Sequence, residues 1–209
     1  MIKQDIINYK FKIENDHLDF YVNGTNRLSF NIISNNKYDK IFLIGPEKSG
    51  KSILGKIWKY NNNAIYYNKN FEDLINSDHN IIIDQLNSKC NEEELFHLIN
   101  YCDTKKLKIL IISSLELNNL KFKTLDLISR LKTFVNANIL NPDDDMLLNI
   151  LTKLFIEKQF IINGEEIFEF IIRRTNRTYA DIIYLVQKLD KLSLEKKRQL
   201  TIPLIKEIL

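Results

Sequence analysis

The chain alternates short, continuous apolar runs with longer stretches whose apolar residues recur every three or four positions. Runs without polar alternation are typical of strands that are buried on both faces of a parallel sheet. After the apolar run 41–44, apolar residues are spaced as on one face of a helix, at Ile53, Leu54, Ile57 and Trp58. The same spacing recurs over 92–101. Strands that alternate with helices predict a parallel sheet with crossover helices. The predicted strands are residues 41–44, 64–67, 81–83, 109–112 and 134–140.

After Asn141 the pattern becomes entirely helical. Pro142 and the acidic residues 143–145 predict a helix start, because acidic side chains favour the positive end of the helix dipole. Further helices are predicted over 165–174 and 178–196, with a short one after Pro203. We therefore expect an α/β domain over residues 1–140 and an all-helical lid over 141–209. Residues 1–30 are expected to be extended, with a turn at 23–26.

Composition narrows the class of protein only slightly. The chain has 209 residues, of which 44% are hydrophobic and 27% charged, and its net charge is +3. This is ordinary for a globular protein and does not by itself indicate a nucleic-acid binder. Cys90 and Cys102 form no metal-binding spacing and suit a reducing compartment. The first dozen residues contain charges, so no signal peptide is expected. No apolar run approaches the ~20 residues that a membrane span requires. The protein is therefore expected to be cytoplasmic.

A phosphate-binding loop is the strongest signal in the sequence. The octapeptide after the first apolar run matches G-x-x-x-x-G-K-[ST] at every fixed position, and a strand and a helix flank it in the required order. In such a loop, backbone N–H groups and the helix N-terminus surround phosphate oxygens. Lys51 is expected to reach the β- and γ-phosphates of ADP or ATP, and Ser52 to bind Mg²⁺. The loop residues are Gly45, Pro46, Glu47, Lys48, Ser49, Gly50, Lys51 and Ser52.

An acidic residue follows a second buried run, as magnesium binding in P-loop proteins requires. Asp84 comes directly after residues 81–83 and is the candidate, although a lone Asp there could also be a turn or helix cap. The next residue, Gln85, stands where many P-loop ATPases carry a second carboxylate. Because an amide is a poor base, intrinsic ATP hydrolysis is expected to be slow.

Several segments together resemble the DnaA branch of the AAA+ family of P-loop ATPases. Residues 19–26 are similar to the branch's adenine-lining stretch, and residues 125–131 to the segment with its arginine finger. The tail, 200–209, resembles the C-terminus of the Hda group of regulators. The resemblance implies an AAA+ parallel sheet followed by a helical lid. It also implies that adenine is contacted by Phe20, Tyr21, Val22 and Asn26.

The resemblance further implies a role in controlling replication. Proteins of this group bind ADP, attach to the sliding clamp of the DNA polymerase, and place an arginine against ATP held by DnaA. Arg130 has the position of that catalytic arginine, although it could instead form a salt bridge at a helix end. The chain ends at Leu209, before the DNA-binding domain that follows the lid in DnaA, so we expect a regulator rather than an initiator.

A clamp-binding peptide is expected near the N-terminus. The corresponding stretch is 8–13, in which Asn8, Tyr9, Phe11 and Ile13 are the candidate contacts. Apolar residues at alternate positions suit an extended peptide in a groove, but they suit an edge strand equally well.

Two positions depart from the pattern of the branch. Ser114 and Leu115 stand where the branch has an acidic residue after its sensing strand, and only Ser114 could contact a phosphate or a water. Lys188 aligns with the sensing arginine of the lid, but it could also belong to a solvated lysine-rich face. The alternative function is a DnaA-like loader or scaffold that self-assembles into homo-oligomers on DNA, and a stand-alone ATPase is a further possibility.

Overall fold

A computed structural model describes residues 7–13, 16–68, 78–161, 164, 166–196 and 199–209. The chain divides into two compact units. The first consists of Met1–Pro46 and Gly50–Leu140, and the second of Asn141–Leu209 together with Glu47–Ser49. Among the described residues, none of the helices combines the length and the apolar character that crossing a membrane would require.

The first unit is built on a five-stranded parallel sheet, as expected from the apolar runs. The strand order is β4–β5–β6–β3–β7, so the strand before the glycine loop lies beside the fully buried β6. Lys40 pairs with Ile109 at one end of the β3–β6 ladder and Ile44 with Ser113 at the other. The strands are β3 (Lys40–Ile44), β4 (Ala64–Tyr66), β5 (Asn80–Leu86), β6 (Ile109–Ser113) and β7 (Val135–Asn138).

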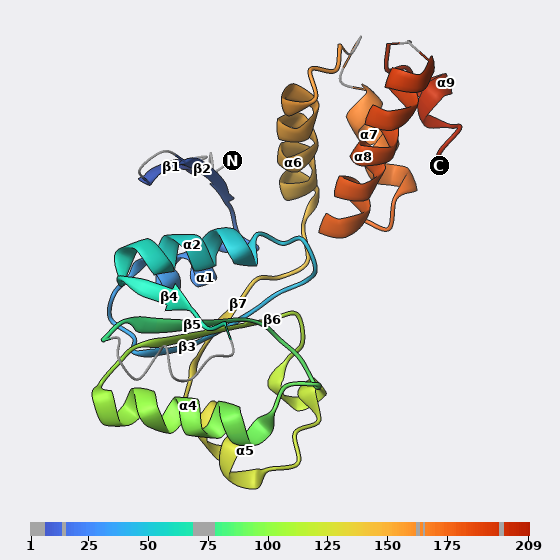
Figure 1. Ribbon diagram of the computed structural model, residues 1–209. Helices are drawn as coiled ribbons and strands as arrows, with labels where there is room; N and C mark the ends of the chain where they lie inside the picture. Colours follow the sequence, from blue (N-terminus) through green and yellow to red (C-terminus); the bar gives the residue numbers. More distant parts are fainter. Residues whose placement is uncertain (1–6, 14–15, 69–77, 162–163, 165, 197–198) are drawn as a thin grey trace. The chain divides into compact units, whose positions relative to one another are not determined.

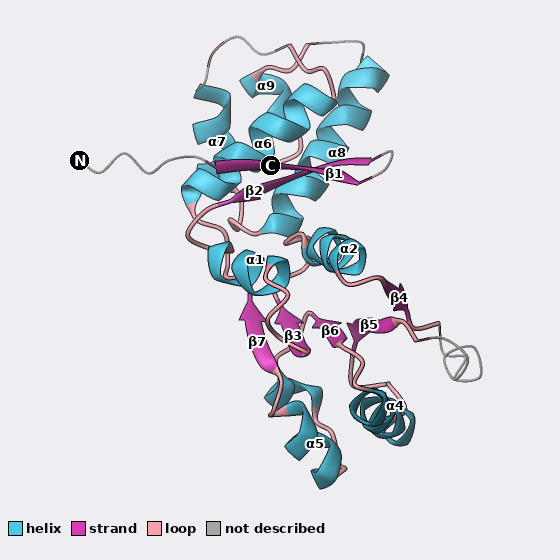
Figure 2. Ribbon diagram, turned by 90° about the vertical axis from the view of Figure 1, so that its left-hand side faces the viewer, coloured by secondary structure: helices cyan, strands magenta, loops and turns pink. Residues whose placement is uncertain are grey.

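Helices cover both faces of this sheet, which explains why its central strands are apolar throughout. Helices α1 (Arg27–Ser34) and α2 (Lys51–Asn61) lie over one face, and α4 (Glu92–Lys105) and α5 (Leu125–Leu131) over the other (Figures 1 and 2). Asn91 caps α4, since its side chain accepts hydrogen bonds from the N–H groups of Glu93 and Glu94. A 3-10 turn at Leu117–Leu120 precedes α5.

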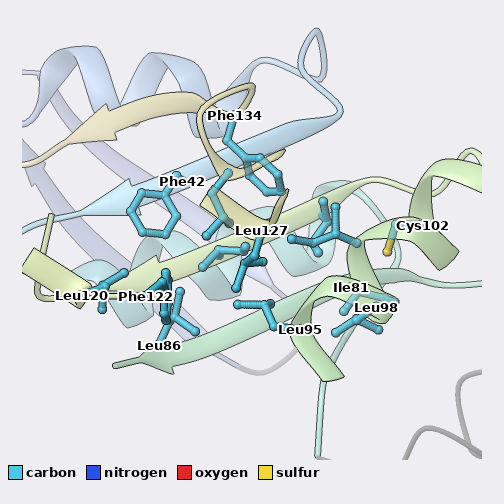
Figure 3. Close-up of a cluster of buried hydrophobic side chains, with 14 residues drawn as sticks. Phe42, Ile81, Leu86, Leu95, Leu98, Cys102, Leu120, Phe122, Leu127 and Phe134 are labelled. Atoms are coloured by element: carbon cyan, nitrogen blue, oxygen red, sulfur yellow. The ribbon is translucent and has the colours of Figure 1, made fainter. Parts of the chain in front are cut away.

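The core on the α4–α5 side of the sheet holds these layers together. Phe42 and Ile81 from the sheet pack against side chains of α4, α5 and the segments around them (Figure 3). Burying each such side chain contributes about 1.5–3 kcal/mol. The other members of this cluster are Leu86, Leu95, Leu98, Ile99, Cys102, Ile109, Ile111, Leu120, Phe122, Leu127, Leu131 and Phe134.

The N-terminal segment forms a separate two-stranded antiparallel sheet. Strand β1 (Ile7–Ile13) pairs with β2 (Asp16–Val22), with Ile7 opposite Val22 and Ile13 opposite Asp16. The prediction of an extended segment up to residue 30 is wrong at its end, because α1 begins at Arg27. Its apolar face buries Phe30, Ile32 and Ile33, a helical spacing that the sequence interpretation overlooked.

The second unit is a small helical bundle. Helix α6 (Asp144–Glu157) begins where the acidic residues predicted, and the Asp143 carboxylate accepts the Met146 N–H at 2.8 Å. The bundle also contains α7 (Glu166–Arg174), α8 (Tyr179–Lys196) and α9 (Ile202–Ile205). Its apolar core includes Leu147, Leu151, Phe155, Phe168, Ile171, Ile182, Leu189 and Leu204.

Most predicted elements are confirmed, with shifts at their ends. Strand β5 is longer than the apolar run and includes Asp84, whereas β7 is shorter than 134–140. The short C-terminal helix was predicted after Pro203 but begins at Ile202. Pro203 therefore lies in its first turn, a position that suits proline. Residue 165, predicted to start a helix, lies outside the described residues.

Candidate nucleotide-binding site

The glycine loop joins the carboxyl end of β3 to the N-terminus of α2. Gly50 is the N-cap of that helix and has a left-handed backbone, with φ 89°. The carbonyl of Gly50 accepts the first helical hydrogen bonds, from Ile53 at 3.0 Å and Leu54 at 3.1 Å. In general, the first N–H groups of a helix lack acceptors within the helix and can bind an anion. The loop and the start of the helix therefore have the backbone arrangement of a phosphate-binding site.

Two side chains of the loop suit a phosphate ligand. The Lys51 ammonium donates to the carbonyl oxygens of Gly45, at 2.8 Å, and Pro46, at 2.6 Å. This places its charge beside the first two residues of the loop. Ser49 is 6% exposed, and among the described residues no group pairs with its buried hydroxyl. A buried hydroxyl without a partner carries a free-energy cost that a bound polar ligand would remove.

The predicted adenine segment reaches the loop through Phe20. A Cβ atom added to Gly50 would lie 2.8 Å from Cε2 of Phe20, so the ring of this residue covers the loop glycine closely. Phe20 also stacks on Phe30, with ring centroids 6.0 Å apart. Tyr21 is half-buried and Val22 buried in the same strand. The structure thus brings the segment next to the phosphate loop, which the sequence alone did not establish.

Asn26 has a structural role in the turn after β2. Its side-chain oxygen accepts the Asn23 N–H at 3.0 Å, and its amide group donates to the Tyr21 carbonyl at 2.9 Å. The Asn23 side chain in turn accepts from the N–H and hydroxyl of Thr25. These bonds fix the path of the segment that carries Phe20, so Asn26 supports the site through the backbone.

Asp84 lies in a bulge near the carboxyl end of β5. The β5–β6 pairing shifts between Ile83 and Leu86, which leaves Asp84 and Gln85 outside the regular ladder. Gln85 has φ 58°, and its N–H donates to the Asp84 carboxylate at 2.8 Å. Burial, together with the charge of Asp84, raises the pKa of the neighbouring Tyr66, whose hydroxyl stays protonated at neutral pH.

The two sensing positions differ in how the structure places them. Ser113 is fully buried, and its hydroxyl donates to the Leu86 carbonyl at 2.9 Å, which joins β6 to β5 beyond the bulge. Ser114 is exposed after the end of β6, and Leu115 is 40% exposed. Lys188 is exposed on α8 and lines a cavity of about 520 Å³ within the second unit, beside Lys191.

Arg130 forms a salt bridge near the end of α5, which was the alternative interpretation of this residue. Its Nη1 lies 3.2 Å from Oδ2 of Asp103, whose other oxygen lies 2.5 Å from Nζ of Lys40. The guanidinium also lies over the ring of Phe96, 5.2 Å from its centroid. Sequence reasoning missed Asp103 and Phe96 as partners of Arg130, and Lys40 as the second partner of Asp103, because nothing in their spacing along the chain indicates these contacts.

This arrangement places Arg130 at the edge of the sheet away from the glycine loop. Lys40 begins β3, whereas the loop follows Ile44 at the other end of the strand. The rise of ~3.3 Å per residue separates these two ends by roughly 13 Å. Asp103 lies six residues before the start of β6, and Arg130 lies five residues before the start of β7. Both therefore precede the starts of these parallel strands, at the same end of the sheet as Lys40.

The candidate clamp residues Asn8, Tyr9, Phe11 and Ile13 all lie in β1. The structure therefore forms a paired strand from this stretch, which is the second of the two interpretations offered by its alternation.

The residues of the loop fit a nucleoside di- or triphosphate. The left-handed Gly50, the Lys51 ammonium and the buried Ser49 hydroxyl all suit a phosphate tail. Among the described residues, no three His, Cys, Asp or Glu side chains gather to hold a metal ion. A single carboxylate and a serine nevertheless fit Mg²⁺, which takes its remaining ligands from water and phosphate.

Comparison with known proteins identifies the second unit and the overall fold. Residues 144–209 match the family described as "Hda, lid domain". No curated protein sequence is found to be similar to the chain. Among solved structures, AMPPCP-bound DnaA from Aquifex aeolicus is 20% identical with a TM-score of 0.66, over 85% of this chain and 66% of that one.

Two further structures extend the comparison. Domain III of the Thermotoga maritima replication initiation protein DnaA is 17% identical with a TM-score of 0.71, over 91% of this chain and 93% of that one. The T. maritima RuvB Holliday junction branch migration motor is 16% identical with a TM-score of 0.61, over 81% and 60%. At these identities the likeness establishes the fold. The chain spans just under two thirds of the A. aeolicus DnaA chain.

Proposed function

The Hda lid domain at residues 144–209 and the DnaA-like AAA+ fold make this chain an Hda-like protein, and from that premise we propose that it regulates replication initiation. In this proposal the chain binds an adenine nucleotide, ADP or ATP, in its glycine loop. Together with the sliding clamp, it then stimulates hydrolysis of ATP held by DnaA. Arg130 supplies the catalytic charge.

The glycine loop supports the nucleotide-binding part of the proposal. Gly50 and the start of α2 offer N–H donors, and Lys51 offers a cation for the β- and γ-phosphates. Ser52 and Asp84 would hold Mg²⁺, which draws negative charge from the phosphate oxygens when bound. The likeness to AMPPCP-bound DnaA supports adenine as the base. In this chain, the buried ring of Phe20 lies beside the loop, in the segment proposed to contact the base.

The single observation that carries the regulatory part is the position of Arg130. Its contacts with Asp103, and through it Lys40, place the guanidinium at the edge of the sheet opposite the loop. Arg130 is therefore too far from the nucleotide of its own chain to stabilise a transferring phosphate there. A guanidinium placed this way can act on a nucleotide held by another molecule.

The test is phosphate release from ATP-loaded DnaA mixed with the protein, sliding clamp and DNA. Wild-type protein should stimulate hydrolysis, and Arg130→Ala should abolish most of the stimulation, since an arginine in trans contributes ~10³–10⁵ in rate elsewhere. Arg173→Ala, on the exposed surface of α7, is the matched control. Omitting the clamp tests whether the stimulation depends on it. Absence of stimulation by wild type, or full stimulation by Arg130→Ala, contradicts the proposal.

The same geometry supports a second candidate, a DnaA-like scaffold that self-assembles on DNA. In such an assembly Arg130 would act on the nucleotide of the next copy. Nucleotide-dependent oligomers, salt-dependent DNA binding and concentration-dependent ATP hydrolysis by the pure protein would favour it. The proposed regulator instead requires DnaA for hydrolysis.

A further inference from the structure

The guanidinium of Arg130 is held between two residues of one helix. Asp103 accepts from Nη1 at 3.2 Å, and Phe96 presents its ring 5.2 Å from the guanidinium carbon. The two residues are seven positions apart on α4, which is about two helical turns, so they lie on the same face. A salt bridge to one and a cation–π contact with the other fix both the end and the plane of the side chain.

Lys40 gives the cluster of Lys40, Asp103 and Arg130 a net positive charge. Each carboxylate oxygen of Asp103 faces one cation, Lys40 on Oδ1 and Arg130 on Oδ2. An arginine paired with a carboxylate alone would form a neutral pair, with little attraction for phosphate. With Lys40 included, the three side chains carry a net charge of +1.

The remaining donors of Arg130 are available to a ligand. A guanidinium has five N–H donors, and within the described part of the chain only Nη1 is seen to donate to a side chain. The Arg130 side chain is 41% exposed and that of Asp103 is 32% exposed. Binding through one nitrogen therefore leaves the other donors for the two-point contact with phosphate oxygens that arginine favours.

We propose that Asp103 and Phe96 are positioning residues that hold Arg130 ready to contact a phosphate of another molecule, with Lys40 offsetting the charge of Asp103. This inference rests on the proposed function for its consequence in catalysis. The arrangement of the four side chains can be tested without it.

The kinetic test uses Asp103→Asn in the DnaA hydrolysis assay. This change keeps the size of the side chain and removes the charge that anchors Arg130. The stimulated kcat should fall about tenfold to a hundredfold, as misplacement of a catalytic group does elsewhere, while the concentration for half-maximal stimulation stays the same. Phe96→Leu should act in the same direction, and Asp103→Glu should restore part of the rate. Glu93→Gln is the matched control, because Glu93 lies on α4 and is 85% exposed.

A direct measurement on the protein alone separates the two proposals. NMR of arginine Nε–H groups, with the Arg130 signal assigned through Arg130→Lys, should show a restricted side chain in wild type and a mobile one in Asp103→Asn. If wild type does not stimulate DnaA, the proposed function fails, while the NMR result still decides whether Asp103 anchors Arg130. An unchanged Arg130 signal in Asp103→Asn, or stimulation equal to or greater than wild type, would overturn the positioning role.

Discussion

Phe20 occupies the space into which a side chain at position 50 would point. A Cβ on Gly50 would lie 2.8 Å from the Phe20 ring, and the backbone of Gly50 has φ 89°. Two independent constraints therefore require glycine here, one from the close approach of β2 and one from the left-handed turn into α2. Together they join the predicted adenine segment to the predicted phosphate loop.

Replacing this glycine should damage both folding and binding. Gly50→Ala should destabilise the protein by about 2–4 kcal/mol, because it adds left-handed strain to a steric overlap. Adenine nucleotide affinity should fall as well. Thermal unfolding and calorimetric titration measure the two effects. Gly24→Ala is the control, since no atom lies within 4 Å of its added Cβ, and it should change stability by less than about 0.5 kcal/mol.

A double variant separates the two constraints. Phe20→Ala combined with Gly50→Ala removes the overlap but leaves the backbone strain. The two changes should therefore show a favourable coupling of about 1–3 kcal/mol in a double-mutant cycle. Strict additivity would contradict the contact between Phe20 and Gly50.

Lys51 should determine the affinity for nucleotide without being needed for folding. Lys51→Ala should weaken ATP binding roughly tenfold to a hundredfold, as expected for the loss of a charge-assisted hydrogen bond to phosphate. Titration calorimetry with ATP and Mg²⁺ gives the affinity. Lys56→Ala, an exposed lysine on the same helix, should bind as wild type does. Equal affinities for Lys51→Ala and wild type would remove the basis for nucleotide binding at the loop.

Glu92 makes the stability of the first unit dependent on pH. Its carboxylate accepts the backbone N–H groups of Thr124, at 2.8 Å, and Lys123, which lowers its pKa below the ordinary 4.5. The ionised form is therefore favoured by folding. The resulting stabilisation is present above about pH 4.5 and is lost as pH falls through the lower pKa of the folded state.

Denaturant titrations of wild type and Glu92→Gln at several pH values test this dependence. Wild type should be the more stable at pH 7, and the difference should shrink as the pH falls below 4. Glu93→Gln removes a charge from the same helical turn but does not remove these hydrogen bonds, so its difference from wild type should be smaller at pH 7. A difference for Glu92→Gln that does not change with pH would exclude this origin of the stability.

The sequence by itself determined the elements and the chemistry that are local in the chain. A continuous apolar run needs burial on both faces, so the central strands β3 and β6 could be predicted from their consecutive apolar residues alone. The glycine loop can likewise be recognised from the sequence, because all the N–H groups of the motif belong to consecutive residues. The helix start at Asp143 is equally local, since the carboxylate caps an N–H group three residues away.

Tertiary structure alone decided which distant residues meet. The bulge at Asp84 arises from pairing with β6, and the close approach of Phe20 to Gly50 brings β2 next to the start of α2. Arg130 meets Asp103 and Phe96 of α4, and Asp103 also meets Lys40, the first residue of β3. No periodicity in the sequence relates these residues. A single chain reveals hydrophobic period and short motifs, whereas contacts across a sheet depend on strand order, which is set by the packing of all the layers together.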